Sequence, residues 1–211
     1  MKKRLLSLLC VLVLTVSVIP AASALEGEAA RAADTLSTLG LIDSTYNLDA
    51  PATRAQAAVL LVHLAGAEQA AAADNWLAGF RDVPAGHWAA DAISQCVTQG
   101  WFQGKSADTF GVGQPMTRSA FAVVLSRFFG WQSSGAYYQI FSDVPQGAWY
   151  EPALRACYEH GAVTRQTGTY RPGDAVTREE LAVTLIRALG YGPIAGLAGE
   201  DTLPFRDVTT N

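Results

Sequence analysis

The sequence predicts a mainly α-helical fold in which three similar helices meet at one axis. The principal observation is an internal repeat: a Thr-Arg pair begins an apolar, helix-patterned stretch that ends at a glycine thirteen residues after the threonine. The three copies are residues 53–66, 117–130 and 177–190. The second observation is that alanine, valine and leucine recur at matching places in the three copies, so the same face of each helix would pack inward.

A further helix is predicted ahead of this stretch in two of the repeats. Residues 80–83 and 141–144 read Phe-x-Asp-Val, and Trp88 and Trp149 each follow six residues after the aspartate. From each tryptophan a helical pattern runs to a glycine, which can adopt the left-handed conformation that ends helices. We expect the two tryptophans to be core residues. We expect the repeated aspartates to hold turns or cap helices, because catalytic carboxylates rarely recur in identical contexts.

The helices that follow Thr-Arg have recognisable first turns. Each threonine can accept a hydrogen bond from a free backbone N–H group and so serve as an N-cap. Gln56 and Glu180, three residues after their threonines, complete a capping box, whereas Ala120 takes this place in the second repeat. The start of the second repeat's helix is therefore expected to be less secured.

The first repeat lacks its own Phe-x-Asp-Val, and this motif occurs instead near the end of the chain, at residues 205–208. We expect the C-terminal segment to complete the first repeat by packing on it. The alternative is a fourth repeat that is cut short. The predicted organisation is a signal peptide at 1–24, repeats at 25–79, 80–140 and 141–204, and the C-terminal segment 205–211.

The first 24 residues have the features of a secretory signal peptide. A basic start precedes a short apolar run, and Ala22-Ser23-Ala24 is a small-residue cleavage pattern. The alternative is an uncleaved membrane anchor, for which the apolar run is short. We therefore expect a secreted protein with no membrane partner after cleavage.

Charge and motif content exclude several classes of protein. The net charge is −4, and loss of the three basic residues of the signal peptide would make it −7. A nucleic-acid partner is not expected, because there is no basic run. The sequence also lacks a nucleophile elbow, a phosphate loop and metal ligands at the usual spacing. We therefore predict no enzyme activity, no cofactor and no metal site.

The two cysteines outside the signal peptide occupy a repeated position. Cys96 and Cys157 each lie four residues before a glycine, and Leu36 has the same place in the first repeat. A position shared with leucine is expected to be apolar core, where a thiol behaves as a small hydrophobe. The alternative is a disulfide between Cys96 and Cys157, which a secreted protein can form.

Arg54, Arg118 and Arg178 are candidate ligand-binding residues. Each occupies the first helical position, where a cation opposes the helix macrodipole by up to about 1 kcal/mol. A helix N-terminus beside a guanidinium suits a carboxylate or phosphate, so three such arginines point to an anionic ligand. The alternative is a local ion pair, which is strongest for Arg178 beside its two glutamates.

Residues 100–104, Gly-Trp-Phe-Gln-Gly, are a second candidate. Gly100 and Gly104 would let a backbone approach a ligand closely, and an exposed Trp101 could stack on a sugar ring. The alternative is a helix end followed by two core residues.

Taken together and in order, these motifs resemble the S-layer homology family over nearly all of residues 26–208. The resemblance implies a pseudo-threefold, three-pronged module with a central three-helix bundle and short connectors. It implies grooves that bind secondary cell-wall polysaccharide of Gram-positive bacteria, often through a pyruvylated amino sugar. The implied function is non-catalytic anchoring at the cell wall, with surface-layer or other cell-surface proteins as further partners. By position, the residues implied to contact the glycan are Arg54, Arg118, Arg178, Gly100, Trp101 and Gly104.

Departures from the family pattern leave other functions open. Ala120 replaces a glutamate of the motif, and Ser44 and Arg165 replace its second glycine in two repeats. One or two grooves are therefore expected to be inactive, and Arg118 and Arg54 are expected to matter more than Arg178. The alternatives are a structural adaptor that binds protein partners and a secreted carbohydrate-active enzyme, which would need a pair of carboxylates.

Overall fold

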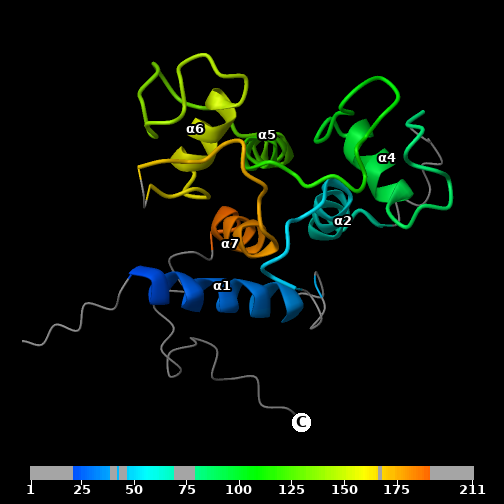
Figure 1. Cartoon of the computed structure of the whole chain (residues 1–211), viewed down its shortest axis with the longest axis horizontal. Helices are drawn as coiled ribbons and strands as arrows, with labels where there is room; N and C mark the ends of the chain where they lie inside the picture. Colours follow the sequence, from blue (N-terminus) through cyan, green and yellow to red (C-terminus); the bar gives the residue numbers. More distant parts are fainter. Residues whose placement is uncertain (1–20, 39–41, 43–46, 69–78, 166–167, 191–211) are drawn as a thin grey trace, which may run out of the picture.

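The computed structural model describes residues 21–38, 42, 47–68, 79–165 and 168–190. The C-terminal Phe-Arg-Asp-Val segment and most of the predicted signal peptide lie outside these residues. Within them the protein is mainly α-helical, as predicted, and its extended segments form only isolated bridges (Figure 1). The helices are α1 (Ala21–Thr38), α2 (Arg54–Leu64), α4 (Ala90–Thr98), α5 (Arg118–Phe129), α6 (Glu151–Glu159) and α7 (Arg178–Ala188).

The three helices that follow Thr-Arg begin at the predicted caps. The side chains of Thr53, Thr117 and Thr177 each accept a hydrogen bond from the backbone N–H group three residues on. Complete capping boxes form in α2 and α7, where residues 56 and 180 can reciprocate, but not in α5, where Ala120 cannot. The difference between the repeats therefore follows from one side chain.

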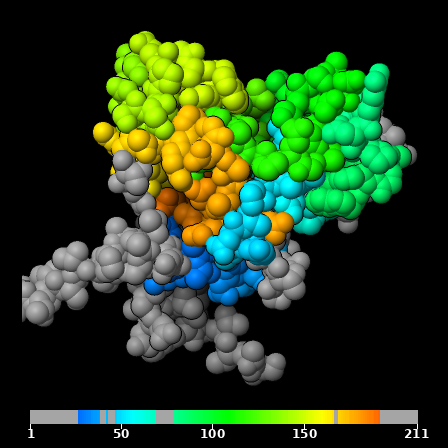
Figure 2. Space-filling model, viewed as in Figure 1, coloured from blue at the N-terminus to red at the C-terminus, as the bar shows by residue number. Residues whose placement is uncertain are grey.

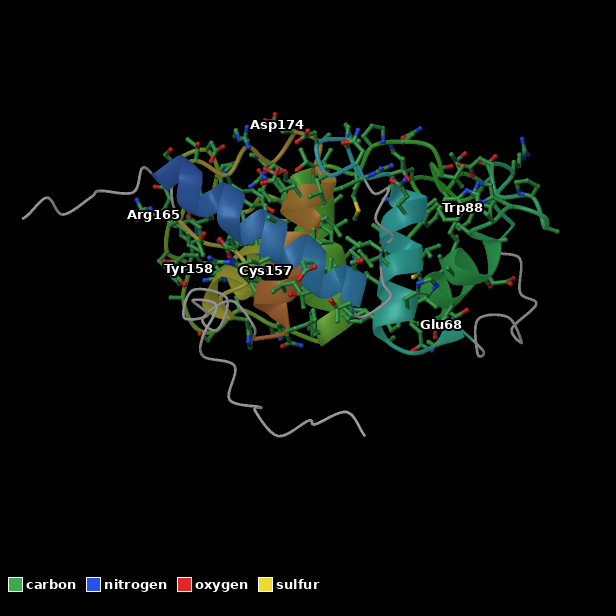
Figure 3. The ribbon with its side chains drawn as sticks, turned by 90° about the horizontal axis from the view of Figure 1, so that it is seen from below. Glu68, Trp88, Cys157, Tyr158, Arg165 and Asp174 are labelled. Carbon is green, nitrogen blue, oxygen red and sulfur yellow. The ribbon has the colours of Figure 1, made fainter. Side chains whose placement is uncertain are left out.

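The helices pack in pairs that join consecutive repeats. Helix α2 packs against α4 and α5 against α6, so the second helix of one repeat meets the first helix of the next. Helix α1 of the first repeat packs in the same way against α7 of the third; it lies beside α7 in Figure 1 and crosses in front of it in Figure 3. The space-filling view shows the α4 and α6 regions as two lobes separated by a notch (Figure 2).

The repeated cysteine position lies at the centre of these pairs. The Cys96 thiol donates a hydrogen bond to the Ala58 carbonyl of α2 (3.5 Å), and the Cys157 thiol donates one to the Ala122 carbonyl of α5 (3.4 Å). Leu36 of α1 is fully buried in a cluster with α7. The expectation of a core position is confirmed, and both thiols are free and buried, so the disulfide is not formed.

Backbone hydrogen bonds join the three repeats in a cycle just before their second helices. The amide of Ala52 donates to the carbonyl of Val176 (2.9 Å), that of Val176 to Met116 (2.8 Å), and that of Met116 to Ala52 (2.9 Å). The starts of α2, α5 and α7 are thereby held together. The pseudo-threefold arrangement of three prongs stays a prediction, and a cycle of this kind favours it.

The prediction that Trp88 and Trp149 are core residues is wrong. Their exposed fractions are 65% and 68%. Both tryptophans lie in the turn that precedes a helix. The buried positions of this turn are already occupied by the valine of Phe-x-Asp-Val and by small residues such as Ala89. Figure 3 places Trp88 at the outer side of the molecule, beyond α2.

None of the helices in the described ranges combines the length and apolar character needed to cross a membrane.

Candidate functional site

A groove of about 670 Å³ lies between α5, α7 and residues 162–164 and 169–171. Its volume falls within the range of small-molecule sites. The apolar part of the lining includes Phe121, Leu125, Phe141, Val176 and Val183. Hydroxyl groups come from Thr164, Thr169, Thr177 and Thr184. The charged lining residues are Arg118, Arg171, Arg187, Glu179 and Glu180.

The aspartate of Phe-x-Asp-Val shapes one wall of this groove. Asp143 accepts hydrogen bonds from the backbone N–H groups of Tyr170 and Arg171, both at 2.7 Å. These bonds hold Arg171 in a left-handed conformation, with φ of 57°, that few non-glycine residues adopt. The carboxylate thus fixes the turn that carries two groove residues, which confirms the expected turn role.

Asp82 has the same role in the second repeat. It accepts hydrogen bonds from the N–H groups of Phe110 (2.8 Å), Gly111 (2.6 Å) and Val112 (3.1 Å). Desolvation would raise the pKa of Asp82, but these backbone hydrogen bonds together hold that pKa below its ordinary value.

Arg118 joins the second repeat to the third at the groove. Its Nε donates to the carbonyl of Tyr170 (2.7 Å), and its guanidinium carbon lies 4.8 Å from the centre of that ring. The Tyr170 hydroxyl donates in return to the Arg118 carbonyl (2.9 Å). Nη1 of Arg118 contacts Oε1 of Glu180. The ion-pair alternative is strongest for Arg178 in the sequence, yet it is Arg118 that forms a pair with a glutamate of the next repeat.

Arg54 makes an equivalent link between the first and second repeats. Its Nε donates to the carbonyl of Phe110 (2.8 Å) and its Nη2 to that of Gln103 (2.7 Å). The side chain is buried, with 9% of the residue exposed, and burial lowers the pKa of the guanidinium while the charge of Asp82 opposes this. These hydrogen bonds to carbonyls of the next repeat explain why α2 has an arginine in its first turn, where a positive charge opposes the helix macrodipole. A role in ligand binding stays a prediction for Arg54.

Arg178 lies at the matching place in α7. Its Nη1 donates to the carbonyl of Asn47 at 3.4 Å, again reaching the repeat that follows in the cycle. The first-turn arginines therefore share one structural contact, since each donates to a backbone carbonyl of another repeat.

None of the candidates Gly100, Trp101 and Gly104 lines this groove. Gly100 follows α4 with a left-handed φ of 73°, and Trp101 is half-buried, edge-on to Phe128 at 4.7 Å. A Cβ at Gly104 would lie 2.4 Å from the ring of Phe80, so a close approach within the protein already requires this glycine. Their role as ligand contacts is not tested by these positions.

Arg171, Arg187 and Glu180 are groove residues that sequence reasoning missed as site residues. Oε1 of Glu180 contacts both Arg118 and Arg171, while Oε2 accepts from the backbone N–H of Thr177 (3.1 Å). One carboxylate therefore closes the capping box and neutralises two groove arginines. The only sequence signal was the capping box, which gave no hint of the two arginines.

Among the residues that the structure describes, no group of three or more His, Cys, Asp or Glu side chains could hold a metal ion.

The fold and the groove define a class of protein: a helical repeat module whose repeats are linked by arginine-to-carbonyl contacts and enclose a hydroxyl-rich groove. The S-layer homology domain model matches residues 79–122 and 140–182. These two stretches are therefore S-layer homology domains. A domain of this family is a non-catalytic, cell-surface anchoring unit.

Proteins with similar sequences include anchoring, surface-layer and enzyme proteins. A cellulosome-anchoring protein of Acetivibrio thermocellus is 31% identical over 163 residues, which are 75% of this chain and 36% of that protein. The surface-layer 125 kDa protein of Lysinibacillus sphaericus is 26% identical over 82% of this chain and 16% of its own length. An endoglucanase of a Bacillus species is 35% identical over 53% of this chain and 12% of its own length.

This chain spans about a third or less of the length of these relatives. The similarity therefore concerns their anchoring regions, and it does not transfer the activity of the enzyme among them.

Proposed function

We propose that this protein is a secreted, non-catalytic module that binds secondary cell-wall polysaccharide in the groove between α5 and α7. The single observation that carries the proposal is the lining of that groove, which brings together apolar side chains, four threonines and three arginines. The ligand is a sugar that bears a carboxylate, and the pyruvylated amino sugar expected from the family fits this description.

Each part of the lining suits one part of such a ligand. The apolar side chains can contact the carbon-bound face of a sugar ring, and the hydroxyls can exchange hydrogen bonds with its polar edge. A guanidinium offers a planar fork that matches a carboxylate. Arg118 is the principal contact, because its side chain lies at the groove and keeps part of its surface exposed.

A ligand carboxylate would share the Arg118 guanidinium with Glu180. Since Arg171 contacts the same glutamate, the groove retains a second cation when the ligand carboxylate approaches. The affinity is therefore expected to depend on salt and on the charge at residue 180.

Arg54 and Arg178 mark the equivalent positions of the other repeats and remain proposed contacts, together with Gly100, Trp101 and Gly104. Arg54 is engaged by two carbonyls. We therefore expect the groove at Arg118 to bind more strongly than the one at Arg54.

A second function, that of an adaptor for surface-layer or other cell-surface proteins, has one observation in its favour. Trp88 and Trp149 are exposed at matching places in two repeats, and exposed indoles are common anchors at protein interfaces.

The test is a pull-down of residues 25–211 on purified cell walls, used before and after the mild acid treatment that removes pyruvyl ketals. We expect binding to untreated walls that is lost after treatment and lost in Arg118→Ala. Arg127→Ala is the matched control, because Arg127 is an exposed arginine at the other end of the same helix. Binding that survives the acid would exclude the carboxylate as the determinant. Absence of binding to either wall would favour the adaptor.

A further inference from the structure

The N-terminal helix reaches the groove between the second and third repeats. Glu28 of α1 accepts hydrogen bonds from Nε and Nη2 of Arg187 in α7, at 2.6 and 2.5 Å. The two side chains are largely buried, with exposed fractions of 24% for Glu28 and 14% for Arg187. A two-bonded contact of this kind fixes the plane of the guanidinium as well as its position.

The remaining terminal nitrogen of Arg187 points to the wall of the groove. Nη1 donates to the hydroxyl of Thr164 at 3.2 Å, and both residues line the groove. Arg187 therefore connects three segments: α1 of the first repeat, α7, and the wall that follows α6. Glu28 engages Nε and Nη2 of the guanidinium, so Nη1 is the nitrogen that lies at the groove wall, where it bonds Thr164.

The other repeats do not have this arrangement. The residues that match Arg187 are His63 in α2 and Arg127 in α5, and both are exposed near the ends of their helices. An exposed arginine samples many rotamers and loses conformational entropy when it binds a ligand. An arginine that a carboxylate already holds in one orientation loses less entropy on binding. Only in this groove, among the described parts of the chain, does an acidic residue of α1 supply that constraint.

Arg187 and Arg118 lie toward opposite ends of the groove. A bridge between Thr117 and Ala175 brings the starts of α5 and α7 together, so Arg118 lies at the starting end of both helices. Arg187 is nine residues into α7 from Arg178, a rise of about 13 Å along the helix axis. This separation exceeds the width of one sugar ring.

We infer that Arg187 and Thr164 form a second subsite of the groove, which binds the next sugar of the polysaccharide or an anionic substituent on it. Glu28 is the positioning residue that holds Arg187 for this role. The groove between the second and third repeats is thus completed by the first repeat. This inference rests on the proposed binding of wall polysaccharide, and it adds that the ligand is longer than one sugar.

The experiment is calorimetric titration of residues 25–211 with polysaccharide released from purified cell walls and separated into single repeating units and longer fragments. The variants are Glu28→Gln, which keeps the shape of the side chain, and Arg187→Lys, which keeps the charge but loses the fork. Arg118→Ala and Arg127→Ala are the comparison variants, and a melting curve is recorded for each protein.

We expect the unaltered protein to bind longer fragments more tightly than single units. Glu28→Gln and Arg187→Lys should lower the affinity for longer fragments by about tenfold, since each weakens one charged hydrogen-bonding group, while single units bind as before. Arg118→Ala should weaken both fragment sizes, and Arg127→Ala neither.

The outcomes separate the two proposals. Equal losses for short and long fragments in Glu28→Gln and Arg187→Lys would show that Glu28 acts only through the fold, and would overturn the inference. Unchanged affinities in both variants would also overturn it while leaving the proposed function intact. If the unaltered protein bound neither fragment, the proposed function would fail, and the subsite with it.

Discussion

Replacing Arg54 with alanine should destabilise the whole fold. The side chain is buried and donates hydrogen bonds to the carbonyls of Phe110 and Gln103, at 2.8 and 2.7 Å. Its guanidinium carbon also lies 4.7 Å from the centre of the Phe110 ring. Alanine would leave both carbonyls without this donor and open a gap beneath the ring.

The expected loss can be worked from these contacts. An unsatisfied buried polar group costs about 1–3 kcal/mol. Gln103 is exposed, so only the Phe110 carbonyl counts fully, and together with the ring contact it gives a loss of about 2–4 kcal/mol. For a domain of this size, each 1 kcal/mol lowers the melting temperature by about 2–4 °C. We therefore expect a fall of about 4–16 °C.

The assay is thermal and urea unfolding of residues 25–211, followed by far-ultraviolet circular dichroism. Arg127→Ala is the matched control, because a change at an exposed position away from special contacts should stay within about 0.5 kcal/mol. A melting temperature for Arg54→Ala within about 2 °C of the unaltered protein would refute the role assigned to these bonds. Wall binding that fails while the fold stays equally stable would make Arg54 a ligand contact instead.

Three further predictions concern other described residues. Glu180→Gln should strengthen binding of an acidic sugar several-fold in calorimetry, because it removes the carboxylate that shares Arg118 with the ligand. The helix cap should be kept, because a glutamine completes the same capping box in α2. Weaker binding would contradict the proposed competition between Glu180 and the ligand carboxylate. Burial raises the pKa of the Cys96 and Cys157 thiols to about 12. A thiol reagent at about pH 8 should therefore react with them only after unfolding, and rapid reaction of the folded protein would refute their burial. Since the pKa of folded Asp82 is lowered, its stabilising effect is present above the unfolded-state pKa and is lost as the pH falls through the folded value. In urea titrations, Asp82→Asn should therefore lose stability at neutral pH and depend less on pH in the acid range, and an unchanged acid dependence would contradict this role.

Features set by neighbouring residues could be predicted from the sequence. The caps at Thr53, Thr117 and Thr177 depend on residues within one helical turn, and each was found where expected. The buried position of Cys96 and Cys157 followed from its equivalence to Leu36. Local spacing and repetition carry enough information for such features.

Features set by contacts between repeats could not be predicted. The partner of Arg118 is Glu180, 62 residues away, and the partner of Arg187 is Glu28, 159 residues away. Trp88 was expected in the core, but its exposure depends on how the turn that carries it meets α4. In each case the deciding partner belongs to a segment whose position the local pattern does not specify.

The pairing of α1 with α7 has a consequence for the biosynthesis of the protein. Helix α1 is made before the other described helices and has its partner in the last of them, α7, so Ala32 and Leu36 lack the cover of Ala182 and Ile186 until α7 has been made. Contacts so distant in the chain are slow to form, and an apolar face that waits for its partner is exposed to aggregation. A nascent chain can therefore assemble the α2–α4 and α5–α6 pairs as it emerges, whereas α1 is secured only after α7 has been made.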